Sequence, residues 1–359
     1  MSRAHRLDGA LQNVAGAFNA AWWSAAAVLA RRVAGRHAAP APQAQAQVSK
    51  AAPPPPRFLR ESWRDAFAKD ARAVGDGLYP PMARSASELA AMVRAGFDVA
   101  ADAPEVGARR RRGGAREARA DAPVGRAYPA YYRQNFHFQS GGWFTPASAR
   151  RYEAQVETLF AGAAGPMRRC ALALLARAWR DRDHRGVRIL DLACGAGGFL
   201  ADLERAFPRA RLAGIDLSEA YVRQAARASG AGLAQANAER LPFANGCFDA
   251  VTCIYVFHEL PPNVRRTVAA EVARVLKPGG LLAFADALQP ADEPRLARPL
   301  ETFPAYFHEP YFPSYLREDL SALFGAAGLE VHASDQAFLT KALLARKTPP
   351  AQADTKRSS

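Results

Sequence analysis

The sequence predicts an α/β protein with a Rossmann-like, doubly wound sheet, and three observations support this fold class. Between residues 187 and 287, short apolar runs alternate with helical patterns, which is typical of βαβ units and a parallel sheet. A glycine-rich segment, DLACGAGGF at 191–199, closes the first run where a helical pattern begins. The second run ends on an acid, Asp216, at the edge where parallel sheets bind their ligands.

Five strands and a closing hairpin are expected in this region. Valines spaced three and four residues apart, from Val264 to Val275, predict the helix between the fourth and fifth strands. A KPGG turn at 277–280 is expected to end that helix, and Ser218 is a predicted N-cap for the helix after the second strand. Residues 328–347 predict an antiparallel hairpin. The strands are predicted at 186–192, 211–217, 232–237, 248–255 and 281–287.

The first part of the chain, residues 1–57, is an Ala- and Pro-rich arm and linker that is predicted to be disordered. Within it, apolar residues from Leu11 to Leu29 recur at spacings of three, four and seven, as on one stripe of a helix. Residues 1–60 contain eight Lys and Arg residues and a single acid, Asp8. An arm with no fixed role is the favoured interpretation. The alternative is an arm that lies on a membrane surface.

Residues 58–184 are expected to form a helical cap before the sheet domain. Four consecutive arginines lie in 107–125, where Gly and Ala surround them and no aromatic residue is interleaved. A solvated loop is therefore favoured over a nucleic-acid site. Residues 128–145 are dense in aromatic residues, and a helix is predicted from Pro146. The remaining boundaries are a sheet domain at 185–347 and a disordered tail at 348–359.

The charge of the chain is unevenly distributed. The net charge is +14, and residues 1–185 carry 29 basic against 15 acidic side chains, whereas residues 186–347 carry 17 against 18. A nucleic-acid groove normally has its own basic surface, so a nucleic-acid partner is not favoured. The four cysteines form no CxxC pair and have no histidine at metal-ligand spacing. This pattern predicts reduced thiols in a cytoplasmic protein and no metal site.

The glycine-rich segment and two polar positions predict a nucleoside site. Gly195 and Gly197 allow a tight turn close to a ligand, Asp216 can accept both hydroxyls of a ribose, and Asn237 follows the third strand. A dinucleotide site would need glycine where Leu200 stands. The carboxylate of Asp191 would repel a pyrophosphate but suits a cationic methionine moiety, so S-adenosylmethionine is favoured over NAD.

Residues 187–286 resemble the class I methyltransferases, particularly the branch similar to the ubiquinone and menaquinone C-methyltransferases. The matching segments are LDLACGAGGF, GIDLS, NAERLPFANGCFDAVTC and RVLKPGG. The resemblance implies a seven-stranded sheet with its last strand antiparallel and S-adenosylmethionine as the cofactor. It also implies which residues form the cofactor site. The methionine part would be surrounded by Asp191, Ala193, Gly195 and Gly197, and the ribose would be held by Asp216. The adenine would be contacted by Leu217, Asn237 and Ala238, and Tyr255 would line the site.

Two positions depart from the family pattern. Ala193 stands where many members have glycine, and little cost is expected because alanine tolerates the negative φ values that glycine adopts. Asn237 replaces the usual aspartate, and its amide oxygen can still accept a hydrogen bond from adenine.

The acceptor side of the site is expected after the fourth strand. His258 or Glu259 could act as general base; alternatively both shape the loop, with Glu259 pairing with Arg265 or Arg266. Two aromatic segments, 128–145 and 301–316, could roof the acceptor.

The sequence thus predicts a methyltransferase for a small aromatic or lipophilic acceptor. Other interpretations are an RNA or protein methyltransferase docking through the basic N-terminal half, a non-catalytic S-adenosylmethionine-binding protein, and an NAD-dependent reductase. The chain is expected in the cytoplasm, and peripheral membrane contact through the N-terminal arm is the alternative to an arm with no fixed role.

Overall fold

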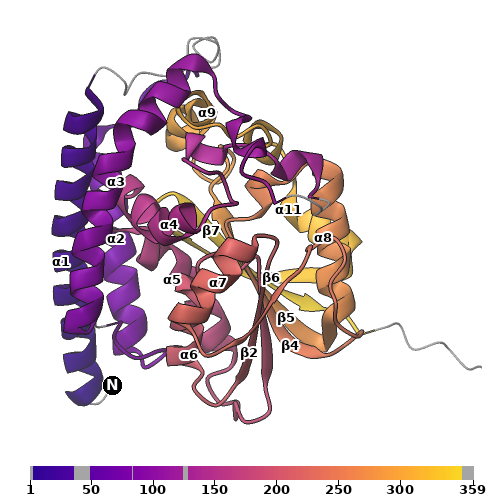
Figure 1. Ribbon diagram of the computed structural model, residues 1–359. Coiled ribbons are helices and arrows are strands. Elements are labelled where there is room, and N and C mark those ends of the chain that lie inside the picture. The colour runs from indigo at the N-terminus through magenta and orange to yellow at the C-terminus, as the bar shows by residue number, and fades with distance from the viewer. Residues whose placement is uncertain (1–2, 36–48, 83, 124–127, 350–359) are drawn as a thin grey trace, which may run out of the picture.

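A seven-stranded sheet forms the centre of the computed structural model, which describes residues 3–35, 49–82, 84–123 and 128–349 (Figure 1). The strand order is β3-β2-β1-β4-β5-β7-β6, and only β7 runs antiparallel to its neighbours. The predicted fold class and the antiparallel last strand are therefore confirmed. The strands are β1 (Arg188–Leu192), β2 (Arg211–Asp216), β3 (Gly232–Gln235), β4 (Phe248–Ile254), β5 (Leu276–Ala287), β6 (Leu329–Ala337) and β7 (Thr340–Lys347).

The fifth strand is longer than predicted. The helix α8 (Pro262–Val275) ends at Val275, and β5 begins at the next residue instead of after a turn at 277–280. The pairing of β4 with β5 shifts register between Phe248 and Ala250, which absorbs the KPGG residues as a local irregularity of the strand.

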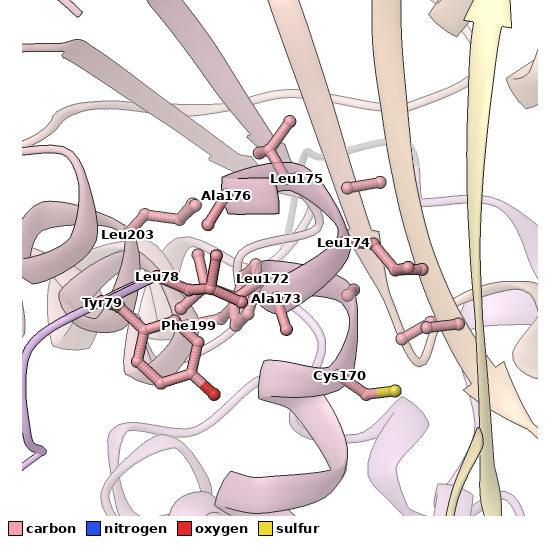
Figure 2. Packing of buried hydrophobic residues seen from close by; sticks show 14 of the residues in the cluster. Leu78, Tyr79, Cys170, Leu172, Ala173, Leu174, Leu175, Ala176, Phe199 and Leu203 are labelled. Carbon is pink, nitrogen blue, oxygen red and sulfur yellow. The ribbon is translucent and has the colours of Figure 1, made fainter. Parts of the chain in front are cut away.

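Helices cover both faces of the sheet because the central strands are apolar on both faces. On one face lie α5 (Ala164–Ala178), α6 (Gly198–Ala206) and α7 (Glu219–Ala228). Figure 2 shows α5 placing a run of leucines and alanines against the strands, with Leu78 and Tyr79 approaching from the N-terminal part. The other face is covered by α8 and α11 (Leu320–Ala326).

The N-terminal half packs beside this domain as a layer of helices (Figure 1). The expectation of disorder across residues 1–57 is wrong for Arg3–Ala34, which form α1, a 32-residue helix against α2 and α3. Alanine favours helix formation, and tertiary packing against α2 and α3 adds the stability that an isolated helix lacks. The proline-rich linker lies mainly outside the described residues. The other helices of this half are α2 (Pro56–Gly75), α3 (Ala86–Arg112) and α4 (Pro146–Leu159).

A buried ion pair joins this layer to the sheet domain. Arg169 of α5 donates two hydrogen bonds of 2.7 Å to Asp70 of α2, and it lies 3.4 Å from Asp202 of α6. Gln12 of α1 and Tyr79 also donate to Asp70. Because a buried charge is costly when unpaired, this network fixes how the helices meet.

The arginine-rich segment is not a solvated loop. Arg109 to Arg112 form the last turn of α3, which Gly113 ends in a left-handed conformation. Cations are favourable at a helix C-terminus because they oppose its dipole. Arg109 is buried and donates to the carbonyl of Phe138 and to Glu117, so it anchors the aromatic segment that follows.

The rest of the chain consists of short helices around the carboxyl ends of the strands. No single helix of the described ranges is long and apolar enough to cross a membrane. Only α4 and α5 taken together reach the necessary length and apolar composition, and they are bent by 93° relative to each other. The short elements are η3 (Glu117–Arg119), η4 (Ala130–Tyr132), η5 (Phe136–Phe138), η6 (Phe257–Glu259), η7 (Pro294–Leu296), α9 (Ala297–Tyr306) and α10 (Phe312–Tyr315).

Candidate functional site

A cavity of about 110 Å³ lies at the carboxyl ends of β1 to β4, and we call it the strand-end cavity. It occupies the position where open parallel sheets bind ligands. The structure brings eight of the eleven predicted site residues together on its walls: Ala193, Gly195, Asp216, Leu217, Asn237, Ala238, Tyr255 and Glu259.

Asp216 is fixed at the end of β2 by two backbone donors. Gly195 donates its N–H to Oδ2 at 3.0 Å, and Ser218 donates its N–H to Oδ1 at 2.8 Å. Each carboxylate oxygen retains a lone pair for a ligand hydroxyl. Burial raises the pKa of Asp216 to about 6, although the backbone hydrogen bonds lower it. Ser218 also caps α7, as the sequence predicts.

Asp191 and Gly197 lie behind the cavity wall instead of on it. Asp191 is buried, and Thr252 of β4 donates to its Oδ1 at 2.6 Å. Burial raises the pKa of Asp191 to about 7. Gly197 has φ 89°, and a Cβ there would lie 2.9 Å from Cα of Ala225. Glycine is therefore required at this position for the close approach of α7.

The expectation that Ala193 costs little is wrong. Ala193 has a φ of 55°, in the left-handed region that favours glycine, whereas the sequence argument assumed a negative φ. The turn after β1 must reverse the chain sharply to place Gly195 beside Asp216. The strain is therefore stored in the ligand-facing loop itself.

Asn237 and Ala238 form the wall after β3, and Glu239 follows them. The amide oxygen of Asn237 accepts a 2.9 Å hydrogen bond from the N–H of Glu239, and its Nδ2 lies 3.2 Å from Glu239 Oε1. Tyr131 donates to the same carboxylate at 2.8 Å. The loop that would meet an adenine edge is thus tied to the N-terminal half of the chain.

Aromatic side chains cover the strand-end cavity. The sequence predicts that segment 128–145 roofs an acceptor, but the structure places most of its rings over the strand-end cavity. Trp143 packs edge-on against Tyr152 of α4 and Tyr221 of α7, with centroids 5.5 and 5.3 Å away. The covering rings are those of Tyr131, Tyr132, Phe136, Trp143, Tyr152 and Tyr221.

A second cavity, of about 290 Å³, adjoins the first, and we call it the aromatic cavity. Tyr152, Tyr255 and Glu259 line both cavities. The predicted segment 301–316 contributes three rings, and α4 and α5 contribute aliphatic side chains. Tyr255 has a φ of 57° and holds its hydroxyl 2.6 Å from that of Thr340, so it stands fixed between the two spaces.

His258 faces the aromatic cavity and is held from behind by Asp286 of β5. Its Nδ1 lies 2.6 Å from Asp286 Oδ1, and the backbone N–H groups of Phe257 and His258 donate to Oδ2. The pair fixes the ring so that Nε2 is the free nitrogen. Burial alone lowers the pKa of His258, but the charge of Asp286 outweighs it and raises the pKa to about 9.

The alternative prediction, that Glu259 pairs with Arg265 or Arg266, is wrong. Arg265 donates to Phe257 and Glu318 instead. The carboxylate of Glu259 lies 3.8 Å from Nε2 of His137, which also lies 2.9 Å from Oε1 of Glu309. These three side chains come from the cap, the loop after β4 and the segment after β5.

A groove of about 490 Å³ continues the aromatic cavity toward α1, and we call it the α1 groove. Both spaces are bordered by His137, Tyr152, Val156, Leu159 and Phe307. Small residues of α1 and α3 line its far end, and Arg31, Arg110 and Asp102 stand at its rim.

Sequence reasoning missed Asp286 and Glu309, and it did not relate His137, a candidate acceptor contact in segment 128–145, to either of them. One signal was present, because Asp286 interrupts the apolar run of a predicted buried strand. His137 and Glu309 lie far from the methyltransferase-like motifs, and no spacing in the sequence relates them.

Comparison with known proteins relates the sheet domain to methyltransferases. A family model described as a methyltransferase domain matches residues 189–280. An uncharacterized methyltransferase of Synechocystis is 34% identical over 147 residues, 41% of this chain and 68% of that protein. A ubiquinone/menaquinone biosynthesis C-methyltransferase of Desulfotalea psychrophila is 34% identical over 148 residues, which is 40% of this chain and 57% of that enzyme.

A phthiotriol/phenolphthiotriol dimycocerosates methyltransferase of Mycobacterium leprae is 40% identical over 111 residues, 30% of this chain and 40% of that enzyme. The chain thus spans about half the length of these last two relatives.

Proposed function

The chain belongs to the class I S-adenosylmethionine-dependent methyltransferases, and from this premise we propose that it transfers the methyl group to an aromatic or lipophilic small molecule. One observation carries the proposal. The strand-end cavity adjoins the mainly apolar aromatic cavity, and Tyr152, Tyr255 and Glu259 line both. A donor in the first and an acceptor in the second would meet at these residues, as an in-line displacement requires.

The cofactor would lie across the ends of β1 to β3. Asp216 would accept the ribose hydroxyls, Leu217 and Ala238 would contact the adenine, and Gly195 would leave room for the methionine part. The sulfonium carries the transferable methyl group and a positive charge. Glu259 and the buried Asp191 place negative charge on the side where that sulfonium would sit.

The aromatic rings over the strand-end cavity would act as a lid. The cavity holds about 110 Å³, whereas sites for ligands of this size usually measure about 300 Å³ or more. The segment that carries Tyr131 to Trp143 would therefore move outward to admit the cofactor. Once closed, the same rings exclude water from the reacting centre.

The acceptor would be apolar over most of its surface. The walls of the aromatic cavity are mainly phenyl rings and aliphatic side chains, and the polar groups, including His137, His258 and Glu259, gather at one end. An aromatic head group would fit there, and the α1 groove offers space for an attached alkyl or prenyl chain.

A proton must leave when the acceptor is a hydroxyl or an activated ring carbon, and the neutral form of His258, which predominates only above its raised pKa of about 9, would receive it. Its Nε2 faces the aromatic cavity, while Asp286 fixes the ring and stabilises the imidazolium that forms. The methyl group passes from sulfur to the acceptor, the carbon–sulfur bond breaks, and neutral S-adenosylhomocysteine remains.

An acceptor screen with methyl-labelled S-adenosylmethionine tests this function. We expect transfer to lipophilic phenols or quinols, and none to bulk RNA or to protein extracts. Replacement of Leu300, in the wall of the aromatic cavity, with tryptophan should raise the acceptor KM while leaving cofactor affinity unchanged. Labelling of RNA or protein, or cofactor binding without transfer to any of the acceptors, would contradict the proposal.

A membrane surface would supply such an acceptor. Three residues of the predicted apolar stripe of α1, Leu11, Val14 and Phe18, are more than half exposed, as is the nearby Leu7. Exposed apolar rows of this kind mark contact surfaces. Leu11→Glu with Phe18→Glu should abolish sedimentation with vesicles that contain an anionic lipid. Sedimentation equal to that of the unmodified protein would refute the membrane contact.

A further inference from the structure

We propose that His137, Glu259 and Glu309 form a binding site for one divalent transition-metal ion, such as Zn²⁺ or Mn²⁺, where the strand-end and aromatic cavities meet. The sequence predicts no metal site, because it offers no cysteine or histidine pair at ligand spacing. The three side chains come together only in the folded chain.

The geometry of the three side chains suits a metal ion. One nitrogen of His137 and one oxygen from each carboxylate all lie within 4.8 Å of one another. The Nε2 atom of His137 is 2.9 Å from Oε1 of Glu309 and 3.8 Å from Oε1 of Glu259. An ion about 2.0–2.2 Å from each atom fits such separations with small side-chain shifts.

Glu309 provides a second, independent observation. Its side chain is fully buried, and neither carboxylate oxygen accepts a hydrogen bond from any residue that the structure describes. The ring of His137 approaches Oε1 as an ion pair without hydrogen-bond alignment, and Oε2 has no donor among the described residues. A buried carboxylate without a donor is costly, so this side chain is prepared for a cation.

The backbone around His137 is strained toward this arrangement. His137 and Phe138 have φ values of 56° and 55°, which non-glycine residues rarely adopt. The N–H of His137 donates to the carbonyl of His308, so the strained turn is attached to the residue beside Glu309. Strain of this kind persists where a particular side-chain direction matters to function.

The charges of the cluster also favour a divalent ion. Burial lowers the pKa of His137, but the two carboxylates outweigh it and raise the pKa to about 10, so an ion would displace the imidazolium proton. The ligands that remain, two carboxylates and a neutral imidazole, carry a charge of −2, which one divalent cation balances. Three protein ligands leave coordination positions open, as in catalytic zinc sites, and Mn²⁺ accepts the same nitrogen and oxygen donors. These positions face the aromatic cavity, because His137 and Glu259 line it.

The role of the ion rests on the proposed function. An acceptor hydroxyl bound to the ion would lie beside Glu259, which borders both cavities, and hence close to the methyl donor. Coordination lowers the pKa of that hydroxyl, so its proton passes more readily to His258. The substrate class is therefore narrowed to acceptors that carry an aromatic hydroxyl.

Metal binding is measured without cofactor or acceptor. Absence of metal binding can therefore be distinguished from absence of methyl transfer. Chelator-treated full-length protein is titrated calorimetrically with ZnCl₂ and, separately, with MnCl₂. We expect binding of one ion per chain with at least one of these metals. Glu309→Gln and Glu259→Gln should each weaken it at least about tenfold, because each removes a direct ligand.

A surface pair provides the matched control. Glu330 and His332 are exposed on β6, away from the three cavities, and would capture an adventitious ion in a similar way. Glu330→Gln should leave the affinity unchanged. Binding that survives Glu309→Gln, or that is lost in Glu330→Gln, would overturn the proposal, as would no binding of either metal. Circular dichroism of each variant confirms that the fold is retained.

Discussion

Replacement of Asp216 with asparagine should weaken cofactor binding about 100-fold. The two oxygens of Asp216 are held by Gly195 and Ser218 and would each accept one ribose hydroxyl. Asparagine keeps the shape but has one acceptor oxygen and no charge. A hydrogen bond to a charged group contributes about 1.5–3 kcal/mol, so loss of one and weakening of the other costs about 3 kcal/mol.

The assay is calorimetric titration with S-adenosylhomocysteine at pH 8, where the carboxyl of Asp216 is ionised. Glu219→Gln is the matched control, because Glu219 lies in the first turn of α7, outside the wall of the strand-end cavity. An affinity of Asp216→Asn within threefold of the unmodified protein would refute the ribose assignment.

The pH dependence gives a second readout of the same group. The pKa of Asp216 is about 6 in the free protein, and binding requires the carboxylate, so affinity should fall about tenfold per pH unit below 6. The cofactor affinity of Asp216→Asn should not fall in this way, because the titrating carboxyl group is absent. In the free protein the raised pKa stabilises the fold below about pH 4, and this stabilisation is lost as the pH rises through 6. Thermal unfolding of the two proteins across this range should therefore diverge.

Three further predictions concern catalysis and stability. His258→Gln should lower kcat about 10²- to 10⁴-fold with unchanged affinity for S-adenosylhomocysteine, and an unchanged kcat would exclude it as the base. Ala193→Gly should stabilise the protein by about 0.5 kcal/mol in urea unfolding, because the relief of backbone strain exceeds the added entropy of the unfolded chain. The control Ala201→Gly, in α6, should destabilise the protein by about 1 kcal/mol. A loss of stability in both variants would show that Ala193 is not strained. Asp70→Ala should cost about 3–5 kcal/mol in the same assay because it leaves the buried Arg169 unpaired, and a cost below 1 kcal/mol would show that the pair is not needed.

The local patterns of the sheet domain were sufficient to predict its elements. Strand and helix periodicity, with a glycine-rich turn after β1, predicted the strands within a few residues and placed Gly195 and Asp216 at one edge. These features depend on residues that are close together in the sequence, so they can be predicted from it. The KPGG segment was misassigned because proline and glycine usually end an element, whereas pairing with β4 holds it in the sheet.

The N-terminal half was harder to predict because its order depends on distant partners. The proline-rich linker led to a prediction of disorder for all of residues 1–57, although alanine favours helix formation and the apolar stripe of α1 is helical. Burial of Trp23 and the contact of Gln12 with Asp70 hold this helix in place. The arginine run looked like a solvated loop because the sequence does not show that Arg109 anchors the carbonyl of Phe138. In both segments, packing and long-range hydrogen bonds fix the position of a helix, and the sequence does not show these distant partners.

The sequence by itself determined the sheet, the order of its elements and the cofactor edge, because each follows from periodicity and from motifs within a few dozen residues. Only the tertiary structure decided what surrounds that edge. It placed Asp286 behind His258, joined His137 to Glu259 and Glu309, and laid an aromatic lid over the cavity. These contacts unite segments more than 20 residues apart, and the free energy of packing, which no local pattern encodes, selects them.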